Sequence, residues 1–392
     1  MLVFERDLGS GLFLYSCFFF VFSRAGGKEA GAMRAELVAS AAAAAAAGLN
    51  HVLICFLLLR PCGCVLTLAS CSWLNPRRTA ALLVWQRWRT KARRSSKWLR
   101  TADMASFVDR YDTWLLDCDG VVWLGEQAVE GVPEFLAELR RRGKRVFFVS
   151  NNASKHRDTY LSKFKKLGIQ ATVDDVITSA LGAAQYVVQR YGRGAKVFAC
   201  GTSGLVQELS EAGATVVEPS YVSNTQSNAT GPALIAKGEL DMDIRAVVAG
   251  ADWTLSHRKL SYATLCLTCI PGCELIATNR DRLVPQSDGY KYPGAAATVG
   301  ALEAVSDRRA DVTIGKPGPK LLEILFSSNA SLHKRRAIMV GDRLDTDIEF
   351  GNLGQVDTLL VLTGVTDRRA AEAAVGAQQP CFVVGSLANL HG

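Results

Sequence analysis

The sequence has little that would place it in a membrane, in an oxidising compartment or on nucleic acid. The apolar run at residues 12–22 is shorter than the ~20 residues of a membrane-spanning helix. Acidic residues precede it, whereas a secretory signal begins with basic ones. A second apolar run at 51–59 is followed at once by arginine, proline and glycine, which leaves one marginal span over 38–59 as an alternative. Membrane contact is therefore expected only if the N-terminal segment provides it.

The eleven cysteines lack the regular spacing of a disulfide framework, and five of them precede residue 104. Cys266, Cys269 and Cys273 lie close together in CLTCIPGC. A zinc site would need a fourth ligand and usually a second pair of cysteines, so ordinary buried thiols are the simpler interpretation. This cysteine usage indicates a reducing compartment, and we expect a cytoplasmic protein.

The net charge of +8 is concentrated at the front of the chain. Residues 1–103 hold 14 Lys/Arg and 5 Asp/Glu, a balance of +9, whereas residues 104–392 hold 31 and 32, a balance of −1. The larger part of the chain therefore lacks the basic character of a nucleic-acid surface, and we expect no nucleic-acid partner.

The N-terminal segment, residues 1–103, does not have the pattern of a folded domain. Residues 41–47 are an alanine run, and residues 75–101 carry nine Arg/Lys and no acidic residue. Such a stretch resembles an organelle transit segment or a membrane-surface helix. Because Met104 stands immediately before the first strand pattern, the upstream residues could also be an over-extended reading frame or be removed. An organelle is the alternative location if this segment acts as a transit sequence.

After residue 104, short apolar runs alternate with helical patterns, which predicts a parallel sheet with helical crossovers. From about residue 195 the pattern restarts as a second, smaller α/β unit. Proline and glycine at 293–294 predict the return of the chain to the first sheet. The predicted organisation is an α/β core from residues 104–194 and 295–392, interrupted by the second unit at 195–294.

The stretch LLDCDGVVW places two carboxylates at the end of a buried strand. Side chains alternate along a strand, so Asp117 and Asp119 would share a face if it stayed extended, and Gly120 allows a sharp turn. Two acids there lose hydration and repel each other, which requires a cation or different protonation states. The simpler alternative is a strand followed by an Asx-type turn.

Four predicted strands end in charged or reactive groups, at the edge of the sheet where ligands bind in such folds. These groups are Asp117/Asp119, Ser150/Asn151/Asn152, Lys316 and Asp342/Asp347. Each of these groups alone could belong to a turn or a helix cap, but turns do not explain four such strand ends at the same edge of the sheet. Carboxylate oxygens suit Mg2+, and lysine with small donors suits phosphate. Together they indicate phosphoryl transfer.

The runs LLDCDGVVW, FFVSNNASK, ATNRD, GKPGP and MVGDRLDTDI closely resemble those of the haloacid dehalogenase superfamily of aspartate-dependent phosphatases, in the same order. The resemblance covers about residues 106–392 and is strongest to its phosphoglycolate and pyridoxal phosphatases. It implies a Rossmann-like parallel-sheet core with a large α/β cap inserted between the second and third motifs. The second unit at 195–294 fits that cap.

The resemblance also implies roles. Asp117 would be the nucleophile, and Asp119 would protonate the leaving group and then activate water. Mg2+ would be bound by Asp117, the Asp119 carbonyl and Asp342, with Asp347 holding the waters of the metal. The phosphoryl oxygens would be held by Lys316 and by the polar run Ser150, Asn151 and Asn152. The two catalytic aspartates would need different protonation states, which their environments can produce.

Some positions depart from the family pattern. Ala153 stands where serine or threonine is frequent, and Ala296 replaces a second glycine. The pyridoxal-phosphate branch carries histidine just before the cap proline, where this chain has Val284, closer to the aliphatic residue of the phosphoglycolate branch. We therefore expect Val284 to line the substrate site.

The leading interpretation is a Mg2+-dependent phosphatase of a small phosphorylated metabolite, with 2-phosphoglycolate favoured and glycerol 3-phosphate as a further candidate. Pyridoxal 5'-phosphate is the alternative substrate. A catalytically silent scaffold or a redox role for the cysteines is disfavoured by the complete set of motif residues. We also expect a homodimer formed through the cap.

Overall fold

The computed structural model describes residues 17–23, 52–60, 63–68, 96–100, 104–223, 231–285 and 289–391. The chain divides into two compact units, residues 1–89 and 90–392. In the first unit, β1 (Cys17–Ser23) pairs in parallel with β2 (Val52–Arg60), which pairs antiparallel with β3 (Gly63–Leu68). Apolar and aromatic residues favour strands here, so the expectation of a segment without folded structure is wrong for these strands. The alternative of a membrane helix is wrong for residues 52–59, and the alanine run lies outside the described residues.

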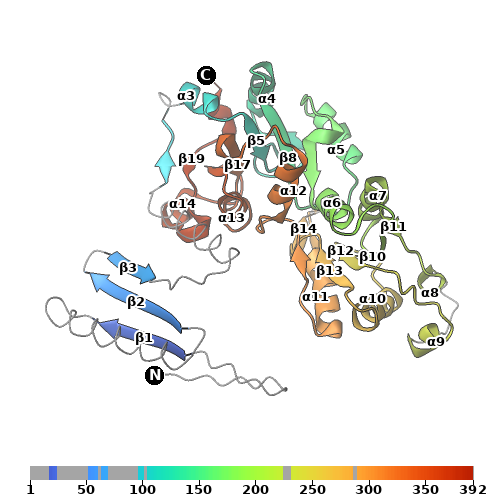
Figure 1. Cartoon of the computed structure of the whole chain (residues 1–392). Coiled ribbons are helices and arrows are strands. Elements are labelled where there is room, and N and C mark those ends of the chain that lie inside the picture. The colour runs from blue at the N-terminus through green and yellow to red at the C-terminus, as the bar shows by residue number, and fades with distance from the viewer. Residues whose placement is uncertain are drawn as a thin grey trace. The chain divides into compact units, whose positions relative to one another are not determined.

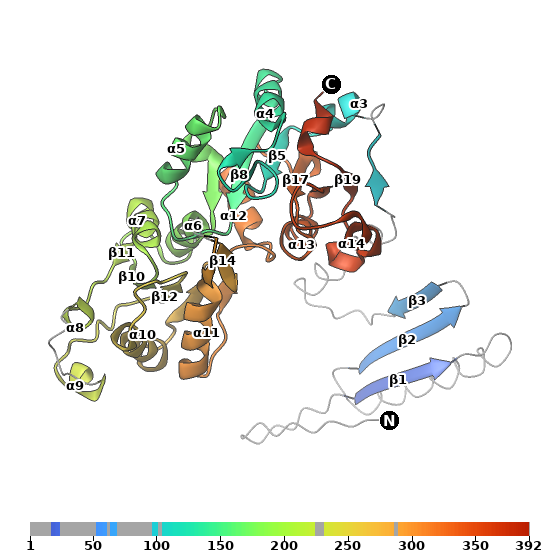
Figure 2. The same cartoon turned by 180° about the vertical axis from the view of Figure 1, so that it is seen from behind.

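The core of the second unit is a seven-stranded parallel sheet (Figures 1 and 2). Its order is β4 (Lys97–Trp98), β19 (Phe382–Val384), β18 (Asp357–Val361), β17 (Ala337–Gly341), β5 (Thr113–Leu116), β8 (Arg145–Ser150) and β9 (Val176–Thr178). Every residue of β5 is buried, as expected for a strand covered on both faces. The predicted α/β class, with a parallel-sheet core and an inserted second unit, is confirmed.

Helices cover both faces of this sheet. One face packs against α3 (Met104–Asp109), α4 (Val132–Arg141) and α5 (Asp158–Lys166). In α4, four apolar residues at helical spacing, Val132, Phe135, Leu136 and Leu139, are all buried. The other face packs against α6 (Ser179–Tyr191), α12 (Lys320–Ser328) and α13 (Glu349–Leu353).

The inserted unit, the cap, contains a second parallel sheet. Its order is β11 (Thr215–Val216), β10 (Lys196–Cys200), β12 (Ala246–Ala249), β13 (Glu274–Ala277) and β16 (Val312–Thr313). One face packs against α10 (His257–Cys269) and α11 (Ala295–Ser306). The other face shares a hydrophobic cluster with α6, α7 (Ser203–Ala212) and core strands. Core and cap are therefore joined by continuous packing.

Smaller elements complete the two sheets. The antiparallel pair β14 (Leu283–Pro285) and β15 (Lys291–Pro293) extends from the cap, and β6 (Trp123–Leu124) pairs with β7 (Gln127–Ala128) after β5. Further α-helices in the described ranges are α8 (Ser220–Ser223), α9 (Gly231–Ala236) and α14 (Arg368–Ala373).

Two predicted boundaries of the core need correction. The cap does not end at residue 294, because α11 packs on the cap and β16 pairs with β13. Pro293 and Gly294, interpreted as a return linker, instead close β15 and cap α11; helical periodicity does not reveal which sheet a helix covers. At the front, β4 pairs with β19, so the core sheet begins before Met104.

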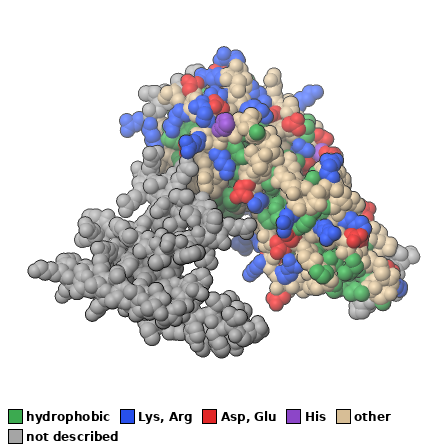
Figure 3. All heavy atoms as spheres, in the orientation of Figure 1, with side chains coloured by type: hydrophobic (Ala, Val, Ile, Leu, Met, Phe, Trp, Pro, Cys, Tyr) green, Lys and Arg blue, Asp and Glu red, His purple; other side chains and the backbone are tan. Residues whose placement is uncertain are grey.

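The surface and the cysteines can be described within the same ranges. On the face in Figure 3, basic and acidic side chains of the described residues are interspersed. Of the helices that the structure describes, none combines the length and the apolar character needed to cross a membrane. The cysteines Cys118, Cys200, Cys266, Cys269, Cys273 and Cys381 are free thiols.

Candidate active site

Strand β5 carries Asp117 to the carboxyl edge of the core sheet. The Asp117 N–H donates to the Val340 carbonyl (2.9 Å), which continues the pairing with β17 by one residue. The chain then turns at Gly120, whose φ of 83° is favourable only for glycine. The exposed carboxylate of Asp119 accepts a hydrogen bond from Trp123 Nε1 (2.9 Å). The two aspartates thus occupy different environments, one enclosed and one open to solvent.

Lys316 provides the cation of the site. Its Nζ lies 2.5 Å from Asp117 Oδ1 and 2.8 Å from Asp347 Oδ1, and it donates to the Val149 carbonyl (3.1 Å). Burial opposes its charge, but Asp117 and Asp347 raise the pKa of Lys316 above its ordinary value. A buried, paired ammonium stays protonated and can attract phosphoryl oxygens.

Asp117, Asp342 and Asp347 form a cluster in which one oxygen from each lies within 4.8 Å of the others. Asp342 follows β17, and Asp347 lies in the π-helical turn η4 (Leu344–Ile348). Burial and the other two carboxylates raise the pKa of Asp117 well above its usual range, although Lys316 opposes the shift. Burial and the charge of Asp347 raise the pKa of Asp342 to about 6. The single positive charge of Lys316 therefore does not neutralise the three carboxylates.

The cluster fits a hard divalent cation. Asp342 Oδ2 accepts the Val365 N–H (2.7 Å), but its buried Oδ1 has no hydrogen-bond partner. A Cβ at Gly120 or Gly364 would lie 2.4 or 2.0 Å from Asp342 Oδ2, so glycines are needed around this carboxylate. An unpartnered buried oxygen among carboxylates is the donor chemistry that Mg2+ requires.

Strand β8 ends in the polar run Ser150, Asn151 and Asn152. The Asn151 side chain bonds the backbone of Lys316 twice, accepting from its N–H (2.8 Å) and donating to its carbonyl (3.0 Å). Ser150 Oγ accepts from Tyr160 Oη and from the Asn152 N–H, both at 3.2 Å. Asn152 Oδ1 accepts from the N–H and hydroxyl of Ser154, so this side chain stabilises a turn.

The structure brings most of the predicted residues together. Direct bonds join Lys316 to Asp117, to Asp347 and, through its backbone, to Asn151. The Asp119 side chain is outside the carboxylate cluster, as expected if only its carbonyl binds the metal. Val284 lies half-buried on β14 and pairs with Tyr292.

Sequence reasoning gave no role to Asp281, although it lies in the ATNRD run. Asp281 Oδ1 accepts a hydrogen bond from Asn151 Nδ2 (3.1 Å) and so joins the cap to the core site. The neighbouring Arg280 bonds both oxygens of Glu303, at 2.6 and 3.2 Å. Arg282 is exposed on the same segment. Of these two arginines, Arg282 is therefore the better placed to meet a substrate.

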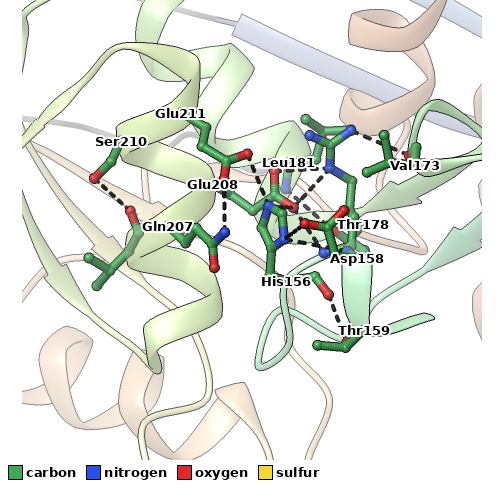
Figure 4. Close-up of polar contacts among 12 residues, drawn as sticks. His156, Asp158, Thr159, Val173, Thr178, Leu181, Gln207, Glu208, Ser210 and Glu211 are labelled. Carbon is green, nitrogen blue, oxygen red and sulfur yellow. Dashed lines mark hydrogen bonds and ion pairs between the residues drawn. The ribbon is translucent and has the colours of Figure 1, made fainter. Parts of the chain in front are cut away.

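Two other groups of potential metal ligands are less suitable. His156, Glu208 and Glu211 also gather at the edge of the cap (Figure 4). Arg157 Nε, however, lies 2.9 and 3.1 Å from the two oxygens of Glu208, so this carboxylate is already paired. The clusters of possible metal ligands among the described residues include no cysteine. Burial raises the pKa of Cys273 to about 11, as expected for an unreactive thiol.

Family models match the two parts of the sequence that form this site. One, the haloacid dehalogenase-like hydrolase, matches residues 114–215, and a second HAD-hydrolase model matches 313–390. Phosphoglycolate phosphatase 2 of Arabidopsis thaliana is 39% identical over 270 residues, covering 68% of this chain and 88% of the relative. Human chronophin is 38% identical over 303 residues, covering 74% and 96%. Chicken glycerol-3-phosphate phosphatase is 38% identical over 287 residues, covering 71% and 90%.

Solved structures agree with these matches. A glycerol phosphate phosphatase of Mycobacterium tuberculosis in complex with calcium has a TM-score of 0.61 and 31% identity, covering 72% of this chain and 76% of its own. The 4-nitrophenylphosphatase of Thermotoga maritima has a TM-score of 0.60 and 30% identity, covering 72% and 97%. The chain therefore belongs to the haloacid dehalogenase-like hydrolases and is a phosphatase.

Proposed function

We propose that the protein hydrolyses small phosphomonoesters through an aspartyl-phosphate on Asp117, with Mg2+ as cofactor. The observation that carries this proposal is the contact of Asp117 with Lys316 beside the carboxylates Asp342 and Asp347. This arrangement places a nucleophile, a cation for phosphoryl oxygens and metal-binding carboxylates within one polar cluster. A catalytically silent scaffold would have no need of this buried, mutually repelling set of charges.

In the first step, a carboxylate oxygen of Asp117 attacks phosphorus, and the bond from phosphorus to the ester oxygen breaks. Asp119 gives its proton to the departing alkoxide. In the second step, Asp119 takes a proton from a water molecule, whose oxygen attacks the aspartyl-phosphate and releases inorganic phosphate. The bond from Trp123 Nε1 orients the Asp119 carboxylate for both transfers. Both aspartates return to their starting states.

Three groups of this chain would hold the phosphoryl oxygens: the Lys316 ammonium, the Ser150 hydroxyl and the backbone N–H of Asn151, whose side-chain amide already donates to Asp281 and to the Lys316 carbonyl. Mg2+ would be held by Asp117, the Asp119 carbonyl and Asp342, with Asp347 bonding the waters of the metal. The ion would neutralise charge on the phosphoryl group during transfer. The unpartnered Oδ1 of Asp342 supports this assignment. Calcium and magnesium complexes of the Mycobacterium tuberculosis relative also support a divalent ion.

Among substrates, 2-phosphoglycolate is our first choice and glycerol 3-phosphate the second, in agreement with the names of the phosphatases that this chain resembles. Val284 offers no hydrogen-bond donor to the ring of pyridoxal 5'-phosphate, the alternative substrate. The exposed Arg282 could pair with the carboxylate of phosphoglycolate. The side-chain oxygen of Asn152 accepts a hydrogen bond within a turn. Asn152 would therefore contribute to the phosphate site through its backbone and not through its side chain.

We further propose a homodimer formed through the cap and a cytoplasmic location, with an organelle as the alternative if residues 1–103 act as a transit sequence. The free thiols of the described residues are compatible with a reducing compartment. The test of the function is phosphate release by the purified full chain from the three named esters, with and without Mg2+. Hydrolysis of none of them, or equal rates after removal of divalent ions, would contradict the proposal.

A further inference from the structure

The loop at residues 150–157, from the last residue of β8 to the start of α5, carries two of the three proposed phosphate ligands and is in contact with the cap along most of its length. Near its start, Asn151 Nδ2 donates to Asp281 Oδ1 (3.1 Å). In its middle, the Ser154 carbonyl accepts a hydrogen bond from Thr202 Oγ1 (2.7 Å). Both partners belong to cap segments that follow strands of the second sheet. The loop therefore lies between the carboxyl edges of the two sheets.

Helix α7 of the cap lies directly on the backbone of this loop at Gly204. A Cβ on Gly204 would lie 2.6 Å from the Lys155 carbonyl carbon and 2.7 Å from the His156 nitrogen. The obstructing atoms are backbone, so no side-chain rotation could relieve such a contact. The absence of a side chain at Gly204 thus sets how closely the cap approaches the loop.

The end of the loop is held by charge (Figure 4). Glu208, which is fully enclosed, accepts from Arg157 Nε (2.9 and 3.1 Å) and from the Arg157 N–H (3.3 Å). The buried His156 lies among three acids, with Nε2 3.0 Å from Glu211 and 3.5 Å from Glu208 of the cap, and Nδ1 3.2 Å from Asp158. Removing either partner of this buried ion pair would leave an uncompensated charge, so Glu208 and Arg157 hold the end of the loop against the cap.

We propose that the cap positions the phosphate-binding loop of the core, with Gly204 and Glu208 as positioning residues that never touch the substrate. The proposal rests on the function proposed above, in which Ser150 and Asn151 hold the phosphoryl group. Displacement of residues 154–157 would be transmitted over a few bonds to these two ligands. The affinity for phosphate then depends on the cap even for a substrate without a leaving group that the cap could recognise.

The test compares Gly204→Ala with Gly300→Ala in the full chain. Both replace a glycine in a cap helix, but a Cβ at Gly300 would meet no atom within 4 Å. The probe is inorganic phosphate, measured as a competitive inhibitor, because it has no leaving group. We expect Gly204→Ala to raise the Ki of phosphate and the KM of the ester by about tenfold, the effect of weakening a bond to a charged group. Gly300→Ala should change neither the Ki of phosphate nor the KM of the ester by more than about twofold, since substitutions at exposed sites usually have small effects on stability and structure.

Unfolding midpoints separate positioning from stability. A lower midpoint for Gly204→Ala with an unchanged Ki would overturn the proposal, because the contact would then be only structural. If Gly204→Ala does not fold, Glu208→Gln decides, since it keeps one acceptor oxygen for Arg157 and should raise Ki in the same direction. The variant Ser150→Ala distinguishes a failure of the proposed phosphate site from a failure of the proposed positioning role of the cap. An unchanged Ki in Ser150→Ala would refute the proposed phosphate site itself, whereas a raised Ki there with an unchanged Ki in the cap variants would refute only the positioning role.

Discussion

Lys316 and Asp117 are 199 residues apart and follow strands of different sheets, yet Lys316 Nζ lies 2.5 Å from Asp117 Oδ1. Asp117 follows the core strand β5, whereas Lys316 comes just after β16 of the cap sheet. The charged centre of the site is therefore complete only when both sheets have formed. Catalytic activity should therefore require that the core and the cap are assembled, and folding of the core alone should not be sufficient for it.

Asp117→Asn should reduce turnover by at least ~10^3-fold, because an amide can neither attack phosphorus nor balance the charge of a metal ion. The measurement is phosphate release at saturating Mg2+, with circular dichroism to show that the variant is folded. Asp112→Asn is a matched control, since Asp112 is an exposed aspartate that precedes the same strand and pairs with Arg336. Retention of a tenth of the wild-type rate by Asp117→Asn would remove Asp117 as the nucleophile.

The fragment 104–392 should fold and hydrolyse the same esters as the full chain, because all motif residues lie within it. It should be less stable than the fragment 90–392, since it lacks β4. The N–H groups of Lys97 and Leu99 donate to the carbonyls of Cys381 and Val383 (both 3.0 Å), and Arg368 stacks on Trp98 at 4.3 Å. Thermal unfolding of both fragments measures the difference, at about 2–4 °C for each kcal/mol lost. An inactive 104–392 beside an active 90–392 would make β4 essential to the site.

Much of the core was predictable because its signals are local. The four buried residues of β5 and the apolar stripe of α4 lie at the positions that periodicity indicated. Thr178 accepts the Leu181 N–H at the start of α6, which is the ordinary role of a threonine before a helical pattern. The strand ends also located Asp342 beside Asp117, whereas Lys316 reaches the site from β16 of the cap sheet and not from the predicted edge of the core sheet. Parallel strands align their carboxyl ends, so this edge follows from element order alone.

Long-range pairing was not predictable in the same way. A two-residue strand such as β16 has no period to detect, so nothing in residues 312–313 indicates that they pair with β13 of the cap. The edge strand β4 was missed for the same reason. The bond between Asp281 and Asn151 joins residues 130 positions apart, and only the fold brings them together. Tertiary contacts of this kind carry the link between cap and core.

The affinity for Mg2+ should fall as the pH drops below about 6. In the metal-free protein, burial and Asp347 raise the pKa of Asp342 to about 6, so a proton competes with the ion there. We expect the half-saturating Mg2+ concentration for activity to rise by about tenfold per pH unit below this value. A constant Mg2+ requirement from pH 5 to 7 would show that Asp342 does not bind the ion.

The stability of the metal-free protein should change in the opposite direction. An acid whose pKa is raised on folding binds protons more tightly in the folded state, so its contribution is complete below the unfolded value of 3.8 and is lost as the pH rises through about 6. Between pH 3.8 and about 6, the contribution of Asp342 should lower the thermal unfolding midpoint, measured in EDTA, as the pH rises. Added Mg2+ should restore the midpoint at pH 7 more than at pH 5. Equal effects of Mg2+ at both pH values would contradict this coupling.

Val284→His should narrow the preference of the enzyme for phosphoglycolate over pyridoxal 5'-phosphate. Val284 lies half-buried on β14 and cannot donate a hydrogen bond, whereas an imidazole could donate one to the polar aromatic ring. A contact of this kind contributes ~1–3 kcal/mol, or about tenfold to a hundredfold in the ratio of kcat/KM values. Leu283→His is the matched control, because neighbouring side chains of a strand face opposite ways and Leu283 is exposed. The measurement is kcat/KM for both substrates with the wild type and the two variants. An equal change of the ratio in both variants would show that Val284 does not face the substrate. A wild-type preference for pyridoxal 5'-phosphate would reverse the proposed substrate while leaving the phosphatase chemistry in place.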